Sequence, residues 1–350
     1  MPTVSVIMPV YKVERFVERA VRSMLSQTLT DFELLAVDDG SPDQSGAILD
    51  RLAQEDARVT VFHQPNAGAP AARNRAIARA AGKYLYFMDA DDWAEPTMLA
   101  DMVEFAEQHD LQLAVAAFFI DTYYDEDRFV REVHRQPGEV FESQRAFREN
   151  AFRLFDANLL YPPWNKLFRA DYLRKNGILF PETFWDDFPF VLAVVRDVER
   201  VGVLDTAYYH FLRARQESET ARYRADMYEK REEEHGWMLE LYDHWDVHDP
   251  GSQEMVQRRY IERVVGCIEN VASPACTLSG RGRREEIARI LANPRVGAAL
   301  SVARPRSFYM KLMLLPVRTR LAGLCLLEGR FIGFVKRRSV KTFAKLKAGR

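Results

Sequence analysis

The sequence predicts an α/β protein that begins with a doubly wound, mostly parallel sheet and continues into a C-terminal helical extension. Three observations carry this prediction. Over about the first hundred residues, short apolar runs alternate with amphipathic helical patterns, which is typical of parallel strands joined by helices. Aspartates follow two of these runs, at the strand ends where ligands bind in open sheets. From residue 226 onward the apolar spacing is helical.

The expected strands are apolar runs with the length and composition of buried parallel strands. They cover residues 4–10, 32–37, 59–63 and 84–88. The helices expected between them, from apolar residues three or four apart, cover residues 14–28, 46–54 and 71–81. Residues 204–209 are a candidate for one more strand. Since parallel strands end at one edge of a sheet, side chains that follow them are expected to meet at that rim.

Length and composition set outer limits. A chain of 350 residues holds two domains, or one large domain with an extension. The net charge of −2 gives no global field that favours nucleic acid. Three cysteines form neither a disulfide framework nor a metal-site spacing and fit a reducing compartment. No signal-peptide pattern precedes the first strand, and no apolar run approaches the ~20 residues that span a bilayer. We therefore expect a cytoplasmic protein.

The stretch YLYFMDADDW, residues 84–93, is the most informative part of the chain. Its apolar half reads as a buried strand, and it ends in the carboxylates of Asp89, Asp91 and Asp92. Negative charge gathered there costs free energy unless a positive group compensates it. Mg²⁺ or Mn²⁺ takes oxygen ligands and commonly bridges a carboxylate to substrate phosphates. The alternative is a solvated turn between strand and helix, since Asp suits turns and helix N-caps.

Other polar residues follow the same strands. Asp38 and Asp39 end the second expected strand, and Arg73 lies on the helix before the fourth. Each has an ordinary explanation: the aspartates as turn formers, Arg73 as a solvated helix residue and Tyr11 as part of the core. Their joint occurrence at strand ends favours a ligand site over four separate coincidences.

Four stretches, VSVIMPVYK, AVDDGSPD, NAGAPAARN and FMDADDW, resemble the family 2 glycosyltransferases, which have the GT-A fold. They occur in the family's order over about residues 4–110. A fifth part, WNKLF at residues 164–168 followed by WDD at residues 185–187, resembles the family's acceptor side. The family usually has Glu-Asp there, whereas this chain has Asp186 before Asp187. The resemblance reaches about residue 215 and leaves the C-terminal third uncovered.

The resemblance implies transfer of a sugar from a nucleotide-diphosphate donor with inversion at the anomeric carbon, of the bacterial polysaccharide-biosynthesis type. UDP is the expected nucleotide by family frequency, and a saccharide or lipid-linked saccharide is the expected acceptor. The competing interpretation is a catalytically silent GT-A-like binding module that partners an active transferase. A dinucleotide-dependent oxidoreductase would need a Gly-rich first turn, which this chain lacks.

The resemblance also implies roles for single residues. The base pocket would be lined by Pro9, Val10 and Tyr11. Asp39 would bind the base edge, and Asp38 would support the turn beside it. Arg73 would reach the base or diphosphate, and the ribose would be faced by Asp89 and Ala90. Asp91 would ligate Mn²⁺ or Mg²⁺, and His210 is a further candidate for that cation or the diphosphate.

Asp187 would be the general base, with Asp186 beside it. The acceptor hydroxyl is a weak nucleophile, and a carboxylate with a raised pKa suits removal of its proton. A second carboxylate next to the first raises one of the two pKa values by repulsion of like charges. The alternative for Asp186 and Asp187 is a helix N-terminus, where acids are favoured by the macrodipole.

We expect a catalytic domain at residues 1–220, with a nucleotide-sugar half at about 1–110 and an acceptor half at about 111–220, and a helical region at 221–350. Helices are expected at residues 227–241, 255–270 and 283–291. The last fifty residues hold thirteen Lys and Arg against one acid, Glu328. Together with their apolar spacing, this suits a helix lying on an anionic membrane. The alternative is a bundle helix with a solvated basic face.

Overall fold

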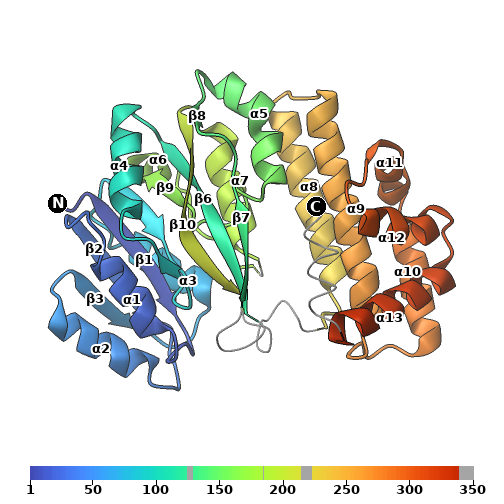
Figure 1. The fold of residues 1–350 in the computed structure, drawn as a ribbon, viewed down its shortest axis with the longest axis horizontal. Helices are drawn as coiled ribbons and strands as arrows, with labels where there is room; N and C mark the ends of the chain where they lie inside the picture. The colour runs from blue at the N-terminus through green and yellow to red at the C-terminus, as the bar shows by residue number, and fades with distance from the viewer. Residues whose placement is uncertain (124–128, 184, 214–222, 339–350) are drawn as a thin grey trace. The chain divides into compact units, whose positions relative to one another are not determined.

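The computed structural model describes residues 1–123, 129–183, 185–213 and 223–338, the last four of them by backbone alone. The chain divides into two compact units, Met1–Arg215 and Gln216–Arg350, called here the N-terminal and C-terminal units. Each is a separate body with its own secondary structure (Figure 1).

The N-terminal unit is built on one mixed sheet with the strand order β3-β2-β1-β4-β9-β6-β10-β5, in which β7 pairs with β6 and β8 pairs with β10. The strands are β1 Val4–Val10, β2 Phe32–Asp38, β3 Val59–His63, β4 Tyr84–Phe87, β5 Trp93–Ala94, β6 Leu113–Tyr123, β7 Phe129–His134, β8 Glu139–Val140, β9 Lys166–Arg169 and β10 Val201–Arg213. The first four strands are parallel to one another, as are β6 and β10. β9 lies antiparallel between β4 and β6 and joins the two parallel parts.

Helices of this unit connect the strands along the chain. They are α1 Val17–Leu25, α2 Ser45–Glu55, α3 Ala69–Ile77, α4 Met98–Gln108, α5 Gln144–Asp156, α6 Ala170–Lys175 and α7 Asp187–Asp197. The first three agree with the sequence-based expectation, apart from their ends. α3 begins two residues earlier than expected, because Gly68 has φ +89° and Pro70 occupies the first turn, where its missing N–H costs nothing.

The C-terminal unit is a bundle of helices. They are α8 Met227–His244, α9 Pro250–Ala272, α10 Gly280–Ala292, α11 Pro294–Val302, α12 Phe308–Arg318 and α13 Ala322–Arg338. α9 is the centre, since it packs against each of the other five. Pro250 begins α9 behind the N-cap Asp249, whose side chain accepts from the amides of Gly251 and Ser252. The three expected helices lie within α8, α9 and α10.

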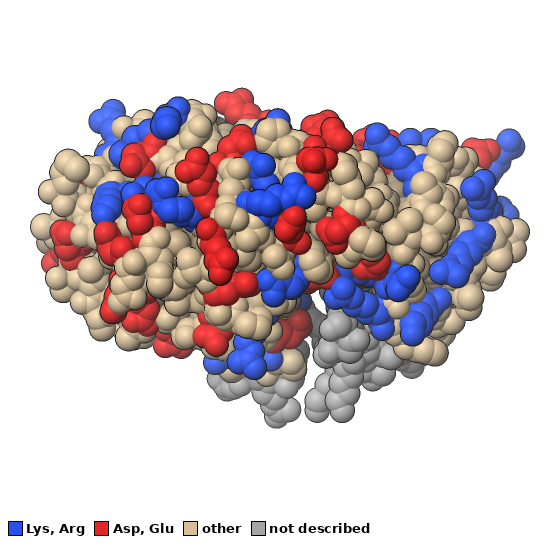
Figure 2. All heavy atoms as spheres, turned by 90° about the horizontal axis from the view of Figure 1, so that it is seen from above, with Lys and Arg blue, Asp and Glu red and all other residues tan. Residues whose placement is uncertain are grey.

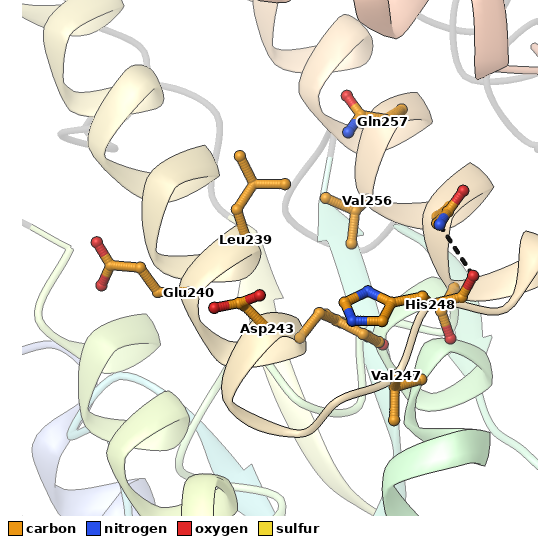
Figure 3. A pocket seen from close by; sticks show the side chains of 10 residues that line it. Leu239, Glu240, Asp243, Val247, His248, Val256 and Gln257 are labelled. Carbon is orange, nitrogen blue, oxygen red and sulfur yellow. Dashed lines mark hydrogen bonds between the residues drawn. The ribbon is translucent and has the colours of Figure 1, made fainter.

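No helix within the described ranges has both the length and the apolar content that crossing a bilayer requires. On the face shown in Figure 2, acids and bases are interspersed over the N-terminal unit. The charged residues of the C-terminal helices, at the right, are mostly Lys and Arg. Within the C-terminal unit, a pocket of about 460 Å³ opens between α8 and α9 and is lined by residues such as Leu239, Asp243, His248 and Val256 (Figure 3). It contains none of the residues that the sequence singled out.

Candidate active site

The ends of β1, β2 and β4 form one rim of the sheet. In the parallel register, Val10 at the end of β1 lies opposite Asp38, and Ile7 lies opposite Phe87. Asp89 follows Phe87 by two residues. The strand tips that the sequence marked as polar therefore share one edge, as expected for parallel strands.

Asp39 fastens this rim to the loop that leads into α3. Its buried carboxylate accepts hydrogen bonds from the amides of Ala67 and Gly68, at 2.9 and 2.8 Å, and from the side-chain amide of Gln64 at 2.7 Å. A carboxylate offers about four acceptor positions, so about one remains for a ligand. Asp38 supports the same turn by accepting from the Ser41 amide at 3.0 Å. The loop geometry thus depends on both aspartates.

The three residues at the end of β1 differ in how much surface they offer. Val10 belongs to the buried core, Pro9 is half-buried, and Tyr11 is exposed. Ala90, at the opposite strand tip, is buried as well. Among these four expected nucleotide contacts, Tyr11 presents the largest free side chain to a ligand.

Arg73 on α3 draws together carboxylates from distant parts of the sequence. It is buried and forms ion pairs with Asp89 at 2.9 Å, Asp186 at 2.7 Å and Asp187 at 3.2 Å. Its guanidinium lies over the ring of Phe180, 4.9 Å from the centroid. Burial disfavours the charge, but the three carboxylates outweigh it and raise the pKa of Arg73. The rim after β4 and the start of α7 therefore form one charged site.

Asp187 is the carboxylate of this site with the most unusual environment. Its Oδ1 is buried and accepts no hydrogen bond from the described residues, while the side chain as a whole is 36% exposed. Burial raises the pKa of Asp187 to about 7; Arg73 opposes the shift, and the charges of Asp186 and Asp89 add to it. A carboxylate that releases its proton near neutral pH and is partly open to solvent is suited to general-base catalysis.

Asp91 is also held in an environment that opposes its charge. Burial, together with the nearby charge of Asp89, raises the pKa of Asp91 to about 6. Arg19 donates to its backbone carbonyl at 3.1 Å, so the carboxylate itself is not used by that contact. A divalent cation would remove this penalty, and a carboxylate oxygen is the ligand that Mg²⁺ and Mn²⁺ prefer. No group of three His, Cys, Asp or Glu side chains that could hold a metal ion occurs among the described residues.

The chain is similar in sequence to known glycosyltransferases. The family described as Glycosyl transferase family 2 matches residues 5–177. The uncharacterized glycosyltransferase EpsJ of Bacillus subtilis (strain 168) is 33% identical over 254 residues, which are 71% of this chain and 72% of EpsJ. The chain belongs to glycosyltransferase family 2. It is a glycosyltransferase, as the resemblance implied.

Solved structures at low identity share the fold of this family 2 glycosyltransferase. TarS 1–349 of S. aureus in complex with UDP-GlcNAc has a TM-score of 0.63 at 20% identity and covers 97% of this chain and 92% of its own. The mannosyltransferase PcManGT from Pyrobaculum calidifontis, in complex with GDP-Man and Mn²⁺, has a TM-score of 0.51 at 16% identity and covers 94% of this chain and 87% of its own. The expected GT-A-type fold with a C-terminal helical extension is confirmed.

In this family 2 glycosyltransferase, His210 lies on β10 with its side chain packed inside the protein. It is fully buried between the rings of Trp93 and Phe119, at 3.5 and 4.5 Å between centroids. Its Nδ1 is 2.9 Å from an Asp121 oxygen and its Nε2 is 3.0 Å from a Glu95 oxygen. Both ring nitrogens are therefore occupied, and the geometry gives His210 a structural role in β10. His210 is therefore not proposed as a ligand of the cation, and Asp91 is the candidate that is kept.

Asp92 and Tyr209 belong to the site but had no assigned role from sequence. Asp92 is buried and accepts from the Tyr209 hydroxyl and the Leu212 amide, each at 2.7 Å. The same hydroxyl accepts from the Asp89 amide at 3.2 Å. β10 is thus tied to the loop that carries Asp89. The signal for Asp92 was its place in the acidic run; nothing marked Tyr209 as its partner.

The stretch WNKLF, which leads into β9, contains buried polar groups. Lys166 is fully buried, and its ammonium donates to the carbonyls of Leu159 and Pro162 and to the Asn165 side chain at 2.7 Å. Burial lowers the pKa of Lys166 well below its usual value. The Trp164 carbonyl accepts from the buried Tyr86 hydroxyl on β4. This part of the motif therefore positions backbone and contributes no free group to a substrate.

Proposed function

We propose that this enzyme transfers a sugar from a UDP-sugar to a hydroxyl of a saccharide or lipid-linked saccharide, with inversion, in the synthesis of a cell-surface polysaccharide. The observation that carries the proposal is the buried Arg73, which joins the rim after β4 to the start of α7. Asp89 on the donor side and Asp186 on the acceptor side, the latter 113 residues from Arg73 in sequence, thereby meet at one place. The choice of UDP is supported by a neighbour of the same fold solved with UDP-GlcNAc.

The donor end of the site is the rim of β1 and β2. The exposed ring of Tyr11 offers a surface for the base to stack on, and Asp39 retains about one acceptor position for a base N–H. Pro9, Val10 and Ala90 shape the pocket through packing and backbone. Asp38 keeps the turn in place, and Asp89 would accept a hydrogen bond from a ribose hydroxyl.

Asp91 would hold the cation, with Mn²⁺ or Mg²⁺ as candidates. When bound, the cation supplies positive charge where the departing nucleoside diphosphate gains negative charge. The raised pKa of Asp91 is the feature that fits such a ligand, because burial and the charge of Asp89 outweigh the compensation that Arg19 and the backbone give the carboxylate. A neighbour of the same fold solved with GDP-Man and Mn²⁺ supports the choice of metal.

Asp187 acts as the general base. Its carboxylate takes the proton of the acceptor hydroxyl as the hydroxyl oxygen bonds to the anomeric carbon, and the bond from that carbon to the β-phosphate oxygen breaks. Attack on the face opposite the leaving group inverts the configuration. Asp186 and Arg73 hold Asp187 in place. Arg73 is tied to three carboxylates and would act as a positioning residue, in place of the contact with the base or diphosphate expected from sequence.

A nucleotide-sugar screen with and without Mn²⁺ tests this function. We expect one donor, with UDP as its nucleotide, to raise the melting temperature only when Mn²⁺ is present, and to be hydrolysed slowly without acceptor. Asp91→Asn should abolish the Mn²⁺-dependent shift and lower turnover about 100-fold, because one electrostatic contact to the leaving group is lost. The exposed Asp31→Asn is the matched control.

The outcomes separate the alternatives. A shift without any turnover would mean that the chain binds donors silently. A shift that is independent of Mn²⁺, or one that Asp91→Asn leaves intact, would remove Asp91 from the cation site.

We infer a cytoplasmic location. Cys267, Cys276 and Cys325 are buried and form no disulfide, which fits a reducing compartment. A nucleotide-sugar donor is consistent with that compartment.

A further inference from the structure

The apolar residues of α12 divide into two opposite stripes. One stripe is buried in the core of the C-terminal unit: Tyr309, Met310, Met313, Leu314 and Val317. The other consists of Phe308, Leu312 and Leu315, at the i, i+4, i+7 spacing of one helix face. The core accounts for the first stripe and leaves the second without a function in the fold.

α13 repeats this division. Cys325, Leu326 and Ile332 enter the same core. Leu324, Leu327 and Phe331, at i, i+3 and i+7, face outward, as does Leu321 just before the helix.

We call the seven outward residues of the two helices the apolar strip: Phe308, Leu312, Leu315, Leu321, Leu324, Leu327 and Phe331. They are 45–75% exposed within 24 consecutive residues. Single exposed apolar residues are ordinary on a protein surface, but a cluster of this kind marks a binding surface.

The charges beside the apolar strip are almost all positive. Lys311, Arg318, Arg320 and Arg330 are exposed, and none has an ion pair with a carboxylate among the described residues. On α10 of the same unit the pattern is different, since Arg281 pairs with Glu285 at 2.8 Å and Arg289 pairs with Glu286 at 2.6 Å. The bases beside the apolar strip are thus available to an external anion.

Glu328 is the single acid of residues 304–350. It is partly buried, and burial raises its pKa, which disfavours its negative charge. It is thus one acid against the four exposed bases of this region.

We infer that α12 and α13 lie on the surface of an anionic membrane, with the apolar strip in the lipid interface and Lys311, Arg318, Arg320 and Arg330 at the head groups. A helix with one apolar face flanked by Lys and Arg binds anionic lipid in this way. Neither helix crosses the bilayer. A second copy is the less suitable occupant, because a symmetric dimer would place each basic patch against its own kind. This surface goes beyond the proposed reaction and does not depend on it.

Flotation of the full chain with lipid vesicles tests the inference. We expect binding to vesicles of phosphatidylcholine with about 30% phosphatidylglycerol, and at least tenfold weaker partitioning to pure phosphatidylcholine. The double substitution Leu327→Ser with Phe331→Ser should reduce partitioning at least tenfold. Both side chains are exposed, so the melting temperature should hold. Leu239→Ser with Leu278→Ser, two exposed leucines outside α12 and α13, is the matched control and should bind as the parent does.

Point substitutions are preferable to truncation, because α12 and α13 contribute buried residues to the core and their removal would unfold the unit. Equal binding by the parent and the Leu327→Ser, Phe331→Ser variant would overturn the inference, as would absence of binding to anionic vesicles. A parent that is dimeric by light scattering, with a monomeric variant and no vesicle binding, would assign the apolar strip to a second copy. Activity of the variant on a water-soluble acceptor should be unchanged, which separates this surface from the active site.

Discussion

Asp187→Asn is expected to lower the rate constant for sugar transfer by about 10³-fold while the affinity for the donor stays within about twofold. General-base catalysis contributes typically 10²–10⁴-fold, and Asn cannot accept the proton of the acceptor hydroxyl. The charged form of Asp187 is disfavoured by burial, so the neutral, isosteric Asn should fold at least as stably near pH 8. Steady-state transfer and a calorimetric titration of UDP with Mn²⁺ measure the two effects.

The pH profile gives Asp187 a second readout. Since the general base works only when it is deprotonated, activity of the parent enzyme should rise with pH through a midpoint near 7 and level off above it. The residual activity of Asp187→Asn should lack that rise. Glu182→Gln, an exposed acid five residues away, is the control and should retain parent kinetics. Near-parent turnover in Asp187→Asn would remove this residue from the mechanism.

Arg73→Met is expected to lower both stability and activity. The substitution removes the guanidinium that three carboxylates surround. Breaking a buried ion pair in this way costs about 3–5 kcal/mol. For a unit of this size, that corresponds to roughly 6–20 °C in Tm. Thermal melting and transfer kinetics check the prediction.

If Arg73→Met does not fold, Arg73→Lys provides a second test of the role of Arg73. Lysine keeps the charge but cannot reproduce the fork that meets Asp89 and Asp186 at once, so we expect a smaller loss of stability and about a tenfold or greater loss of kcat. Arg75→Ala, two residues along the same helix, is the control and should cost about 1 kcal/mol or less, because its partners lie at the surface. An unchanged melting temperature in Arg73→Met would contradict the account of this cluster.

The fold of about the first hundred residues could be predicted well because buried parallel strands appear in the sequence as apolar runs. β1 to β4 agree with the expectation within a residue at each end. The part from β6 to β9 could not, since its strands pair across long separations and in mixed directions. Nothing local in residues 111–163 fixes those partners.

Within the candidate site, the sequence marked residues that the structure brings together, but it did not indicate what they touch. The pairing of Arg73 with Asp186 spans 113 residues, so it has no local signal, and the expectation from sequence was a contact of Arg73 with the base or diphosphate. The placement of His210 depends on Asp121 and Glu95, which come from two other strands or their flanks. For α12 and α13, helical spacing is the same for a buried and an exposed stripe; only the packing shows which is which.

The central claim is that the acids at the strand tips and the general base Asp187 share one site. A structure of the enzyme with UDP and Mg²⁺ tests this claim most directly. We expect Mg²⁺ at roughly 2.0–2.1 Å from a carboxylate oxygen of Asp91 and from phosphate oxygens. The uracil base of UDP should lie against Tyr11 and Asp39, and Asp187 should face the space beyond the β-phosphate. A nucleotide bound away from this rim, or a cation that does not contact Asp91, would contradict the account.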